Sequence, residues 1–176
     1  AGGATLNITD DADFLSGAGG GAVNVAGTLA KTGGTGATTF AGGAALNNSG
    51  AVNIQTGRMD IADGVSSGTF DIGAGRELHF TGGTHTLNAG AGFTGTGMLS
   101  IDGTVTANAD VGMFNPQLWG TLNGTGTVTF SGTGCLWGNW VSTMSGGGVT
   151  TVAAGALLTK DGQHYTSILN QRTLNL

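Results

Sequence analysis

The chain has 176 residues, of which 37 are glycine, 27 are threonine and one is proline; charged residues make up 9% of it, and the formal net charge is −5. Gly, Thr and Asn are poor helix formers and the glycines have no three-residue period, so an all-helical fold and collagen are both excluded. Five Lys and Arg residues are too few to form a basic patch for nucleic acid or an anionic membrane surface. No apolar run is long enough to span a bilayer as a helix. The apolar fraction of 39% argues against disorder. The composition predicts one folded, β-rich domain.

Three acidic residues, Asp10, Asp11 and Asp13, precede the first predicted strand. Carboxylate oxygens are ligands that calcium prefers, so these residues are candidate calcium ligands, although their spacing matches no EF-hand and also suits a solvated turn. Residues 1–20 are predicted to form an N-terminal edge or cap. No other metal site and no cofactor are predicted, because the three histidines lack paired ligand spacing and Cys135 is the only cysteine.

An apolar–polar–apolar triplet then recurs along the chain, with glycine a few residues after each copy. Its copies are Val23-Asn24-Val25, Val52-Asn53-Ile54, Phe70-Asp71-Ile72, Leu99-Ser100-Ile101 and Val128-Thr129-Phe130. Two intervals separate the starts of successive copies along the chain. The longer interval occurs three times, and the shorter one occurs once, from Val52 to Phe70. The period-two alternation puts both apolar residues of a triplet on one face of a strand, and the glycines permit turns between strands. Such units can bury their apolar faces only by stacking on their neighbours.

The repeat predicts an all-β solenoid of about six to nine turns without significant helix, in preference to an antiparallel sandwich, whose strands would usually be longer. In this interpretation the polar residues of the five triplets form one outward column. Aligning Met59-Asp60-Ile61 with Leu78-His79-Phe80 places Arg58 against Glu77 and Asp60 against His79, so that opposite charges face each other. The polar segment 161–171 is predicted to be a cap or a lateral loop.

Several sequence segments resemble the repeats of bacterial surface proteins of the autotransporter-passenger and filamentous-haemagglutinin type. They include Ser49-Gly50-Ala51-Val52-Asn53-Ile54, the stretch from Leu122 to Phe130, and the final Arg172-Thr173-Leu174-Asn175-Leu176. The resemblance covers most of residues 20–176, lies in composition and rhythm, and carries no catalytic signature. It implies a right-handed parallel β-helix that is secreted or displayed on the bacterial cell surface.

The predicted function is therefore that of a non-enzymatic surface stalk, adhesin or self-assembling fibre or matrix subunit. A solenoid has two open ends with unpaired backbone groups, and weak capping with few charges favours association. The expected partners are further copies of the chain, through end-to-end or lateral contacts, or flanking coils of a longer array.

A carbohydrate-binding or polysaccharide-degrading β-helix is the alternative, with host or matrix glycans as partners. Asp60 and Asp71, with His79, are the candidate catalytic residues, since two carboxylates about 5–9 Å apart can hydrolyse a glycosidic bond. Three indoles, Trp119, Trp137 and Trp140, are candidates for stacking on sugar rings. The competing interpretations are a solvated charged ladder for the first set and core filling for the second.

A third function, ice binding, is suggested by Thr-x-Thr triplets similar to those of ice-binding solenoids. The triplets are Thr84-His85-Thr86, Thr104-Val105-Thr106 and Thr127-Val128-Thr129. An ice-binding face needs such triplets in successive turns, and here Asn, Asp and Ser versions alternate with them. The triplets are therefore interpreted as ordinary solvent-facing strand residues.

Overall fold

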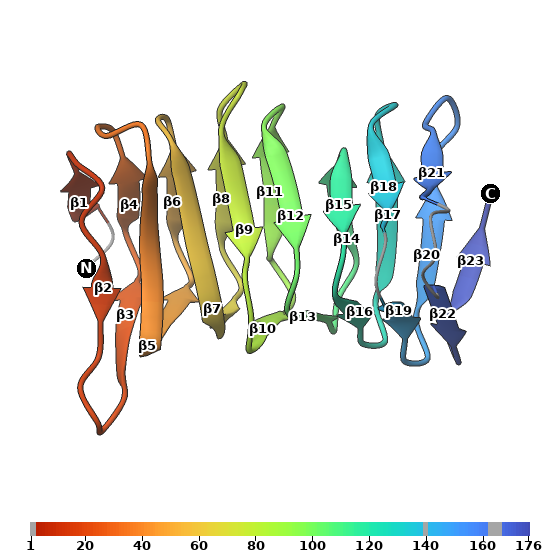
Figure 1. The fold of residues 1–176 in the computed structure, drawn as a ribbon, viewed down its shortest axis with the longest axis horizontal. Coiled ribbons are helices and arrows are strands. Elements are labelled where there is room, and N and C mark those ends of the chain that lie inside the picture. Colours follow the sequence, from red (N-terminus) through yellow and green to blue (C-terminus); the bar gives the residue numbers. More distant parts are fainter. Residues whose placement is uncertain (1–2, 139–140, 162–166) are drawn as a thin grey trace.

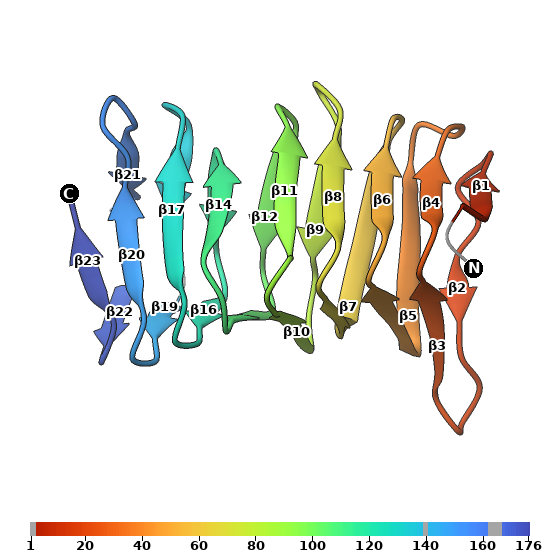
Figure 2. The ribbon, with the colours of Figure 1, turned by 180° about the vertical axis from the view of Figure 1, so that it is seen from behind.

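The computed structural model describes residues 3–138, 141–161 and 167–176. In these residues the chain forms 23 β-strands and no helix, and the strands stack in parallel as a solenoid of about eight turns (Figure 1). In Figure 1 the chain advances from the N-terminus at the left to the C-terminus at the right, and the strands nearer the viewer run downward. The strands of the opposite side, seen in Figure 2, run upward, so the coil is right-handed. The predicted right-handed parallel β-helix is confirmed. The described residues contain no helix that is long and apolar enough to cross a membrane.

Each turn contributes strands to three faces, which we name from their positions in Figure 1. The back face contains β1 (Thr5–Ile8), β4 (Thr28–Lys31), β6 (Ala51–Ile54), β8 (Thr69–Ile72), β11 (Gly92–Gly95), β14 (Val111–Phe114), β17 (Thr127–Ser131), β20 (Val149–Val152) and β23 (Thr173–Asn175). The front face contains β2 (Phe14–Leu15), the first parts of β5 (Ala37–Asn48) and β7 (Arg58–Ser66), β9 (Glu77–Phe80), β12 (Met98–Ile101), β15 (Pro116–Leu118), β18 (Cys135–Trp137) and β21 (Leu158–Lys160). The lower face contains β3 (Gly21–Val25), the second parts of β5 and β7, β10 (Thr84–Leu87), β13 (Thr104–Ala107), β16 (Thr121–Asn123), β19 (Ser142–Ser145) and β22 (Ser167–Asn170).

The front and lower faces form one 14-stranded sheet, because β5 and β7 bend from one face to the other. In β5 the bend falls at Gly42 and Gly43, whose φ angles of 63° and 84° lie in the left-handed region that glycine adopts readily. The register of β5 with β7 shifts across this bend. The back face is divided into a five-stranded and a four-stranded sheet, which separate between β11 and β14.

Inward-facing side chains from successive turns stack on one another and form the core. One such column on the front face consists of Phe40, Ile61, Phe80, Ile101 and Leu118, all 0% exposed. Burying an aliphatic or aromatic side chain of this size stabilises a fold by about 1.5–3 kcal/mol. The stacking of turn on turn is therefore the main source of stability.

The register predicted between the third and fourth turns is confirmed. Arg58 pairs with Glu77 and Asp60 pairs with His79 along strands β7 and β9. The turns are less regular in length than the two intervals between the triplets suggest. The step from Leu99 to its partner Pro116 is shorter than either interval, and the step from Ser142 to its partner Ser167 falls between them.

The predicted single outward column of Asn24, Asn53, Asp71, Ser100 and Thr129 is wrong. Asn53 and Asp71 pair on the back face, whereas Asn24 lies on the lower face and Ser100 on the front face. The reason is that the same alternation serves all three faces. The longer interval between triplets exceeds one turn of the coil, so it carries the next triplet to a different face.

The two segments predicted as possible caps contain strands of the solenoid. In residues 1–20, β1 and β2 pair with β4 and β5, so this segment forms the first turn. In the segment 161–171, β22 pairs with β19 on the lower face, and residues 162–166 lie outside the described chain.

A neutral histidine is buried in the core beneath the lower face. His85 is 0% exposed, its Nε2 lies 2.8 Å from the Oγ of Ser66, and its ring centroid is 4.7 Å from that of Phe80. Its Nδ1 has no hydrogen-bond partner among the described residues. Burial lowers the pKa of His85 to about 4. The nearby backbone and the charge of Asp63 favour a higher pKa, but burial outweighs them.

We expect acid to destabilise the fold as the pH falls from 6.5 to 4, because His85 gains a proton at its ordinary pKa of 6.5 only when the chain unfolds. The loss should reach about 3 kcal/mol of the free energy of unfolding, measured by chemical denaturation across this pH range. A double variant, His85→Leu with Ser66→Ala, should lose much less stability on acidification. An equal loss in the double variant would contradict the assignment to His85.

Candidate functional site

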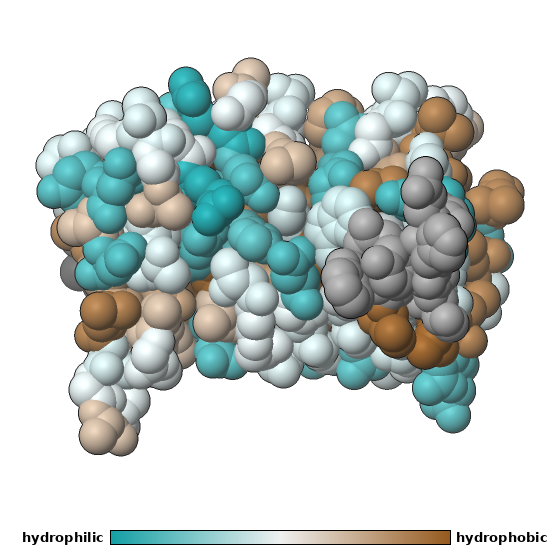
Figure 3. Space-filling view, viewed as in Figure 1, coloured by the Kyte–Doolittle hydropathy of each residue, from teal (hydrophilic) through white to brown (hydrophobic). Residues whose placement is uncertain are grey.

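Four charged or titratable side chains form a connected row on the front face, where hydrophilic residues gather over the middle turns (Figure 3). We call Arg58, Asp60, His79 and Asp102 the charged ladder. Arg58 Nη2 donates a hydrogen bond to Asp60 Oδ2 at 2.9 Å, and Arg58 Nε lies 2.7 Å from Asp60 Oδ1 as an ion-pair contact. His79 lies between two carboxylates, with Nδ1 3.4 Å from Asp60 Oδ1 and Nε2 3.0 Å from Asp102 Oδ2.

The geometry of parallel strands explains why these residues meet. Arg58 and Asp60 are two positions apart on β7 and therefore point to the same side of the sheet. Asp60 is directly opposite His79, and His79 is directly opposite Ser100 on β12. Asp102, two residues beyond Ser100, is then the diagonal neighbour of His79.

Sequence reasoning found Asp60 and His79 together and missed Asp102. The signal was present, because Leu99-Ser100-Ile101 continues the alignment of Leu78-His79-Phe80 by one more turn. Arg58, although opposite Glu77, directs its guanidinium to Asp60 on its own strand. A charge-assisted hydrogen bond to a largely buried carboxylate accounts for that choice.

Within the charged ladder, Asp60 and His79 stabilise each other's charged forms. Burial by itself would raise the pKa of Asp60, but hydrogen bonds from His79 and Arg58 outweigh burial and hold the pKa below its ordinary value of 3.8. The hydrogen bond with Asp60 raises the pKa of His79 above 6.5; burial opposes this shift and Asp102 reinforces it. His79 therefore contributes stability below pH 6.5 that is lost as the pH rises through its folded pKa, and Asp60 contributes stability above pH 3.8 that is lost as the pH falls through its folded pKa.

The candidate catalytic pair Asp60 and Asp71 is not brought together. Asp71 lies on β8 of the back face, where its Oδ1 accepts a hydrogen bond of 2.9 Å from Thr94 Oγ1. Asp60 lies on the front face and is only 6% exposed. With the core between them, the two carboxylates cannot act on one glycosidic bond, so this pair is wrong.

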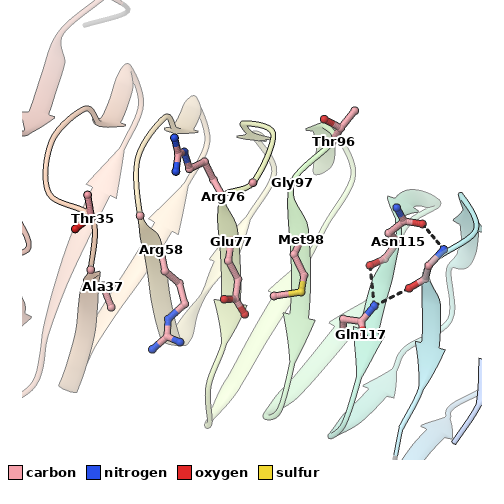
Figure 4. A pocket seen from close by; sticks show the side chains of 14 residues that line it. Thr35, Ala37, Arg58, Arg76, Glu77, Thr96, Gly97, Met98, Asn115 and Gln117 are labelled. Carbon is pink, nitrogen blue, oxygen red and sulfur yellow. Dashed lines mark hydrogen bonds between the residues drawn. The ribbon is translucent and has the colours of Figure 1, made fainter.

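A groove of about 810 Å³ runs along the upper corner, where the back face passes into the front face, from Thr35 to Gly134 (Figure 4). Arg58, Glu77, Met98 and Gln117 line it from successive strands, and Arg76 lies at the corner above them. The side-chain amide of Gln117 donates a hydrogen bond of 2.6 Å to the backbone carbonyl of Gly134, which also lines the groove. The groove is open and long and has both polar and apolar lining, so its shape suits an extended chain better than a compact small molecule.

The candidate calcium ligands each make a contact within the protein. Asp11 Oδ1 lies 2.8 Å from the Nζ of Lys31, which is 0% exposed and also donates to the carbonyl of Asp10 at 2.9 Å. Asp13 Oδ1 accepts a hydrogen bond from the backbone of Thr39 at 2.8 Å. The ammonium of Lys31 thus supplies positive charge among these oxygens, and its hydrogen bond lowers the pKa of Asp11 below 3.8. In the described residues no group of three or more His, Cys, Asp or Glu side chains could hold a metal ion.

A second buried cation, Arg172, lies near the C-terminal end and is 3% exposed. Its guanidinium donates to Thr150 Oγ1 at 2.7 Å and to the carbonyls of Val149 and Gly126 at 2.9 and 3.1 Å. Burial lowers the pKa of Arg172. Sequence reasoning missed both buried cations, because their inward direction depends on the register of the turns.

The two indoles in the described part of the chain, Trp119 and Trp137, do not form one platform for sugar rings. Trp137 points into the core, where it is 9% exposed and stacks on Leu118, so it cannot contact a glycan. Trp119 is partly exposed and lies against Gly138 of the next turn. Trp140 lies outside the described residues.

No family model, curated protein or solved structure matches the chain. The properties of the site therefore follow from its own geometry.

We expect an Asp60→Asn change to lower the pKa of His79 by about 1 pH unit, because it removes one of the two carboxylates that favour the imidazolium. The measurement is an NMR titration of the histidine ring protons. Asp71→Asn is the matched control, since Asp71 lies on the back face and should leave the titration of His79 unchanged. An equal effect of the two changes would refute the charged ladder.

Proposed function

We propose that the chain is a rigid structural segment of a secreted or bacterial cell-surface protein, serving as a stalk, adhesin or fibre subunit, with further coils continuing its ladder. The observation that carries the proposal is the exposure of core columns at both ends of the solenoid. On the back face Leu6 is 48% exposed, whereas Leu29, its partner in the next turn, is 1% exposed. On the lower face Leu169 is 49% exposed, whereas its partner Met144 is 0% exposed.

Further coils would bury these residues in the way that the interior turns bury theirs. The terminal strands also carry backbone groups in position to extend a parallel ladder. Hydrophobic residues gather at the C-terminal end of the molecule in Figure 3. The coils could come from flanking segments of the same polypeptide or from another copy; we propose another copy for the isolated chain.

The charges of the two ends favour a head-to-tail arrangement. The first turn carries Asp10, Asp11 and Asp13, whereas the last turn carries Lys160 at the end of the front-face strand β21, then Asp161 and the buried Arg172. If the ladder continued in register, β2 of one copy would follow β21 of another. Opposite charges near such a junction steer association and oppose the head-to-head orientation.

In sedimentation velocity experiments over a range of concentrations, we expect the wild-type chain to form end-to-end oligomers. Leu6→Lys and Leu169→Lys should each shift the chain toward monomer, because a lysine there would place an unpaired charge in the junction. Val65→Lys is the control, since Val65 is 46% exposed and lies on the lower face, away from both ends. Wild-type monomers at every concentration would contradict assembly from a second copy.

Carbohydrate binding is the second candidate, and the groove along the upper corner is the observation that favours it. Its length suits a polysaccharide strand, and Arg76 at its rim would favour an acidic one.

We expect Arg76→Ala to abolish any retention of the chain on an acidic polysaccharide in affinity electrophoresis, because Arg76 lines the rim of the groove. Asp71→Asn is the control on the opposite face. Retention that is equal in the two variants would exclude the groove as the binding site, and no retention of the wild type on any polysaccharide would remove this candidate.

A further inference from the structure

The outward side chains of the lower face form two straight rows of small hydroxyl and amide groups. The first row consists of Thr84, Thr104, Thr121 and Thr143, which pair directly in four successive turns. The second row consists of Thr86, Thr106, Asn123 and Ser145 in the same turns. Strands β10, β13, β16 and β19, which carry them, lie side by side along the bottom of Figure 1.

This arrangement differs from the sequence expectation that no successive turns carry matching triplets. Thr84-His85-Thr86 lies directly against Thr104-Val105-Thr106, and the first threonine is repeated in the next two turns. The third triplet, Thr127-Val128-Thr129, lies on the back face and belongs to a different surface. The row was hidden in the sequence because its successive members are unevenly spaced along the chain.

The eight side chains of the two rows carry no charge. In the preceding turn the outward residues are Val65, which is opposite Thr86, and Asp63, whose Oδ1 accepts a hydrogen bond of 2.9 Å from the backbone of Thr84. The charged ladder, by contrast, lies on the front face. Neutral groups bind water less tightly than ions do. The water molecules next to these eight side chains can therefore take up the order of an adjoining crystal surface.

The lower face is also held rigidly from within. Beneath the two rows lie His85, Val105, Leu122 and Met144, and each of them is 0% exposed. A close-packed interior allows little movement of the strands above it. The outward threonines, of which Thr84 is exposed and the others are half-buried, are therefore held at fixed positions on the surface.

The spacing of the rows has the regularity of a crystal surface. Neighbouring turns of a sheet are about 4.8 Å apart, and residues two positions apart on a strand are separated by about 6.7 Å. Each threonine hydroxyl can donate one hydrogen bond and accept two, and its methyl group limits where a bound water can lie. Water held between successive threonines of a row then repeats at the spacing of the turns, which is comparable to a lattice repeat of ice and longer than the hydrogen-bonded distance between neighbouring oxygen atoms.

From this geometry we propose that the two rows form an ice-binding face whose occupant is the surface of an ice crystal. One threonine holds water weakly, but the rows place eight neutral polar groups in register, and contacts on one rigid surface act together. Ordering one bridging water costs at most about 2 kcal/mol in entropy. This cost is smaller where the protein already holds the water in place. This inference is independent of the proposed structural role, since it concerns a side face and not the ends.

The test measures adsorption to ice directly. The folded chain is allowed to partition into a slowly growing ice hemisphere, and thermal hysteresis and inhibition of ice recrystallisation are recorded on the same sample. The variants are Thr104→Tyr and Thr121→Tyr, which raise bulky rings from the middle of the first row, and Thr104→Val, which keeps the shape and removes one hydroxyl. The matched control is Thr69→Tyr, an exposed threonine on strand β8 of the back face. Circular dichroism and thermal unfolding establish that each variant is folded.

We expect the wild type and Thr69→Tyr to enter the ice and to inhibit recrystallisation equally. Thr104→Tyr and Thr121→Tyr should fall to the level of a non-binding protein, with Thr104→Val in between. Failure of the wild-type chain to enter the ice overturns the proposal. Equal loss in Thr69→Tyr and Thr104→Tyr also overturns it, because adsorption would then not depend on the lower face.

Discussion

The structure depends on one constraint: the apolar side of each turn can be buried only by the turns next to it. Phe40, Ile61 and Phe80 illustrate this, since each is fully buried by its partners in neighbouring turns although no single strand provides an enclosed core. The parallel register that achieves this burial also fixes the outward residues. The charged ladder and the threonine rows are therefore both set by the packing inside, and the exposed core columns at the ends follow from the same rule.

Polar groups inside such a coil must find partners at the corners, where the backbone leaves its ladder. Lys31 near the first turns and Arg172 near the last meet this need, since each donates several hydrogen bonds to backbone carbonyls. Ser66 and His85 pair with each other in the middle of the molecule. Each of these groups ties residues of different turns together, so they reinforce the apolar stacking and make its register specific.

The outer faces differ in chemistry although they share one sheet. The front face has a row of charges that neutralise one another across three turns, and the upper corner beside it is grooved. The lower face has neutral threonines in line. A solenoid can vary its faces independently in this way, because outward residues contribute little to the burial that holds the turns together. A structural role for the whole and a binding role for one face are thus compatible.

The sequence alone determined the fold class, because two-residue alternation, abundant glycine and scarce charge are compatible with few other architectures. It also indicated the local register between Met59-Asp60-Ile61 and Leu78-His79-Phe80, where charges of opposite sign marked the alignment. Only the tertiary structure decided which face each triplet occupies, because the same alternation serves all three faces and the turns vary in length. For that reason Asp71 proved to lie away from Asp60, Asp102 joined His79, and four threonines scattered between residues 84 and 143 came into one row.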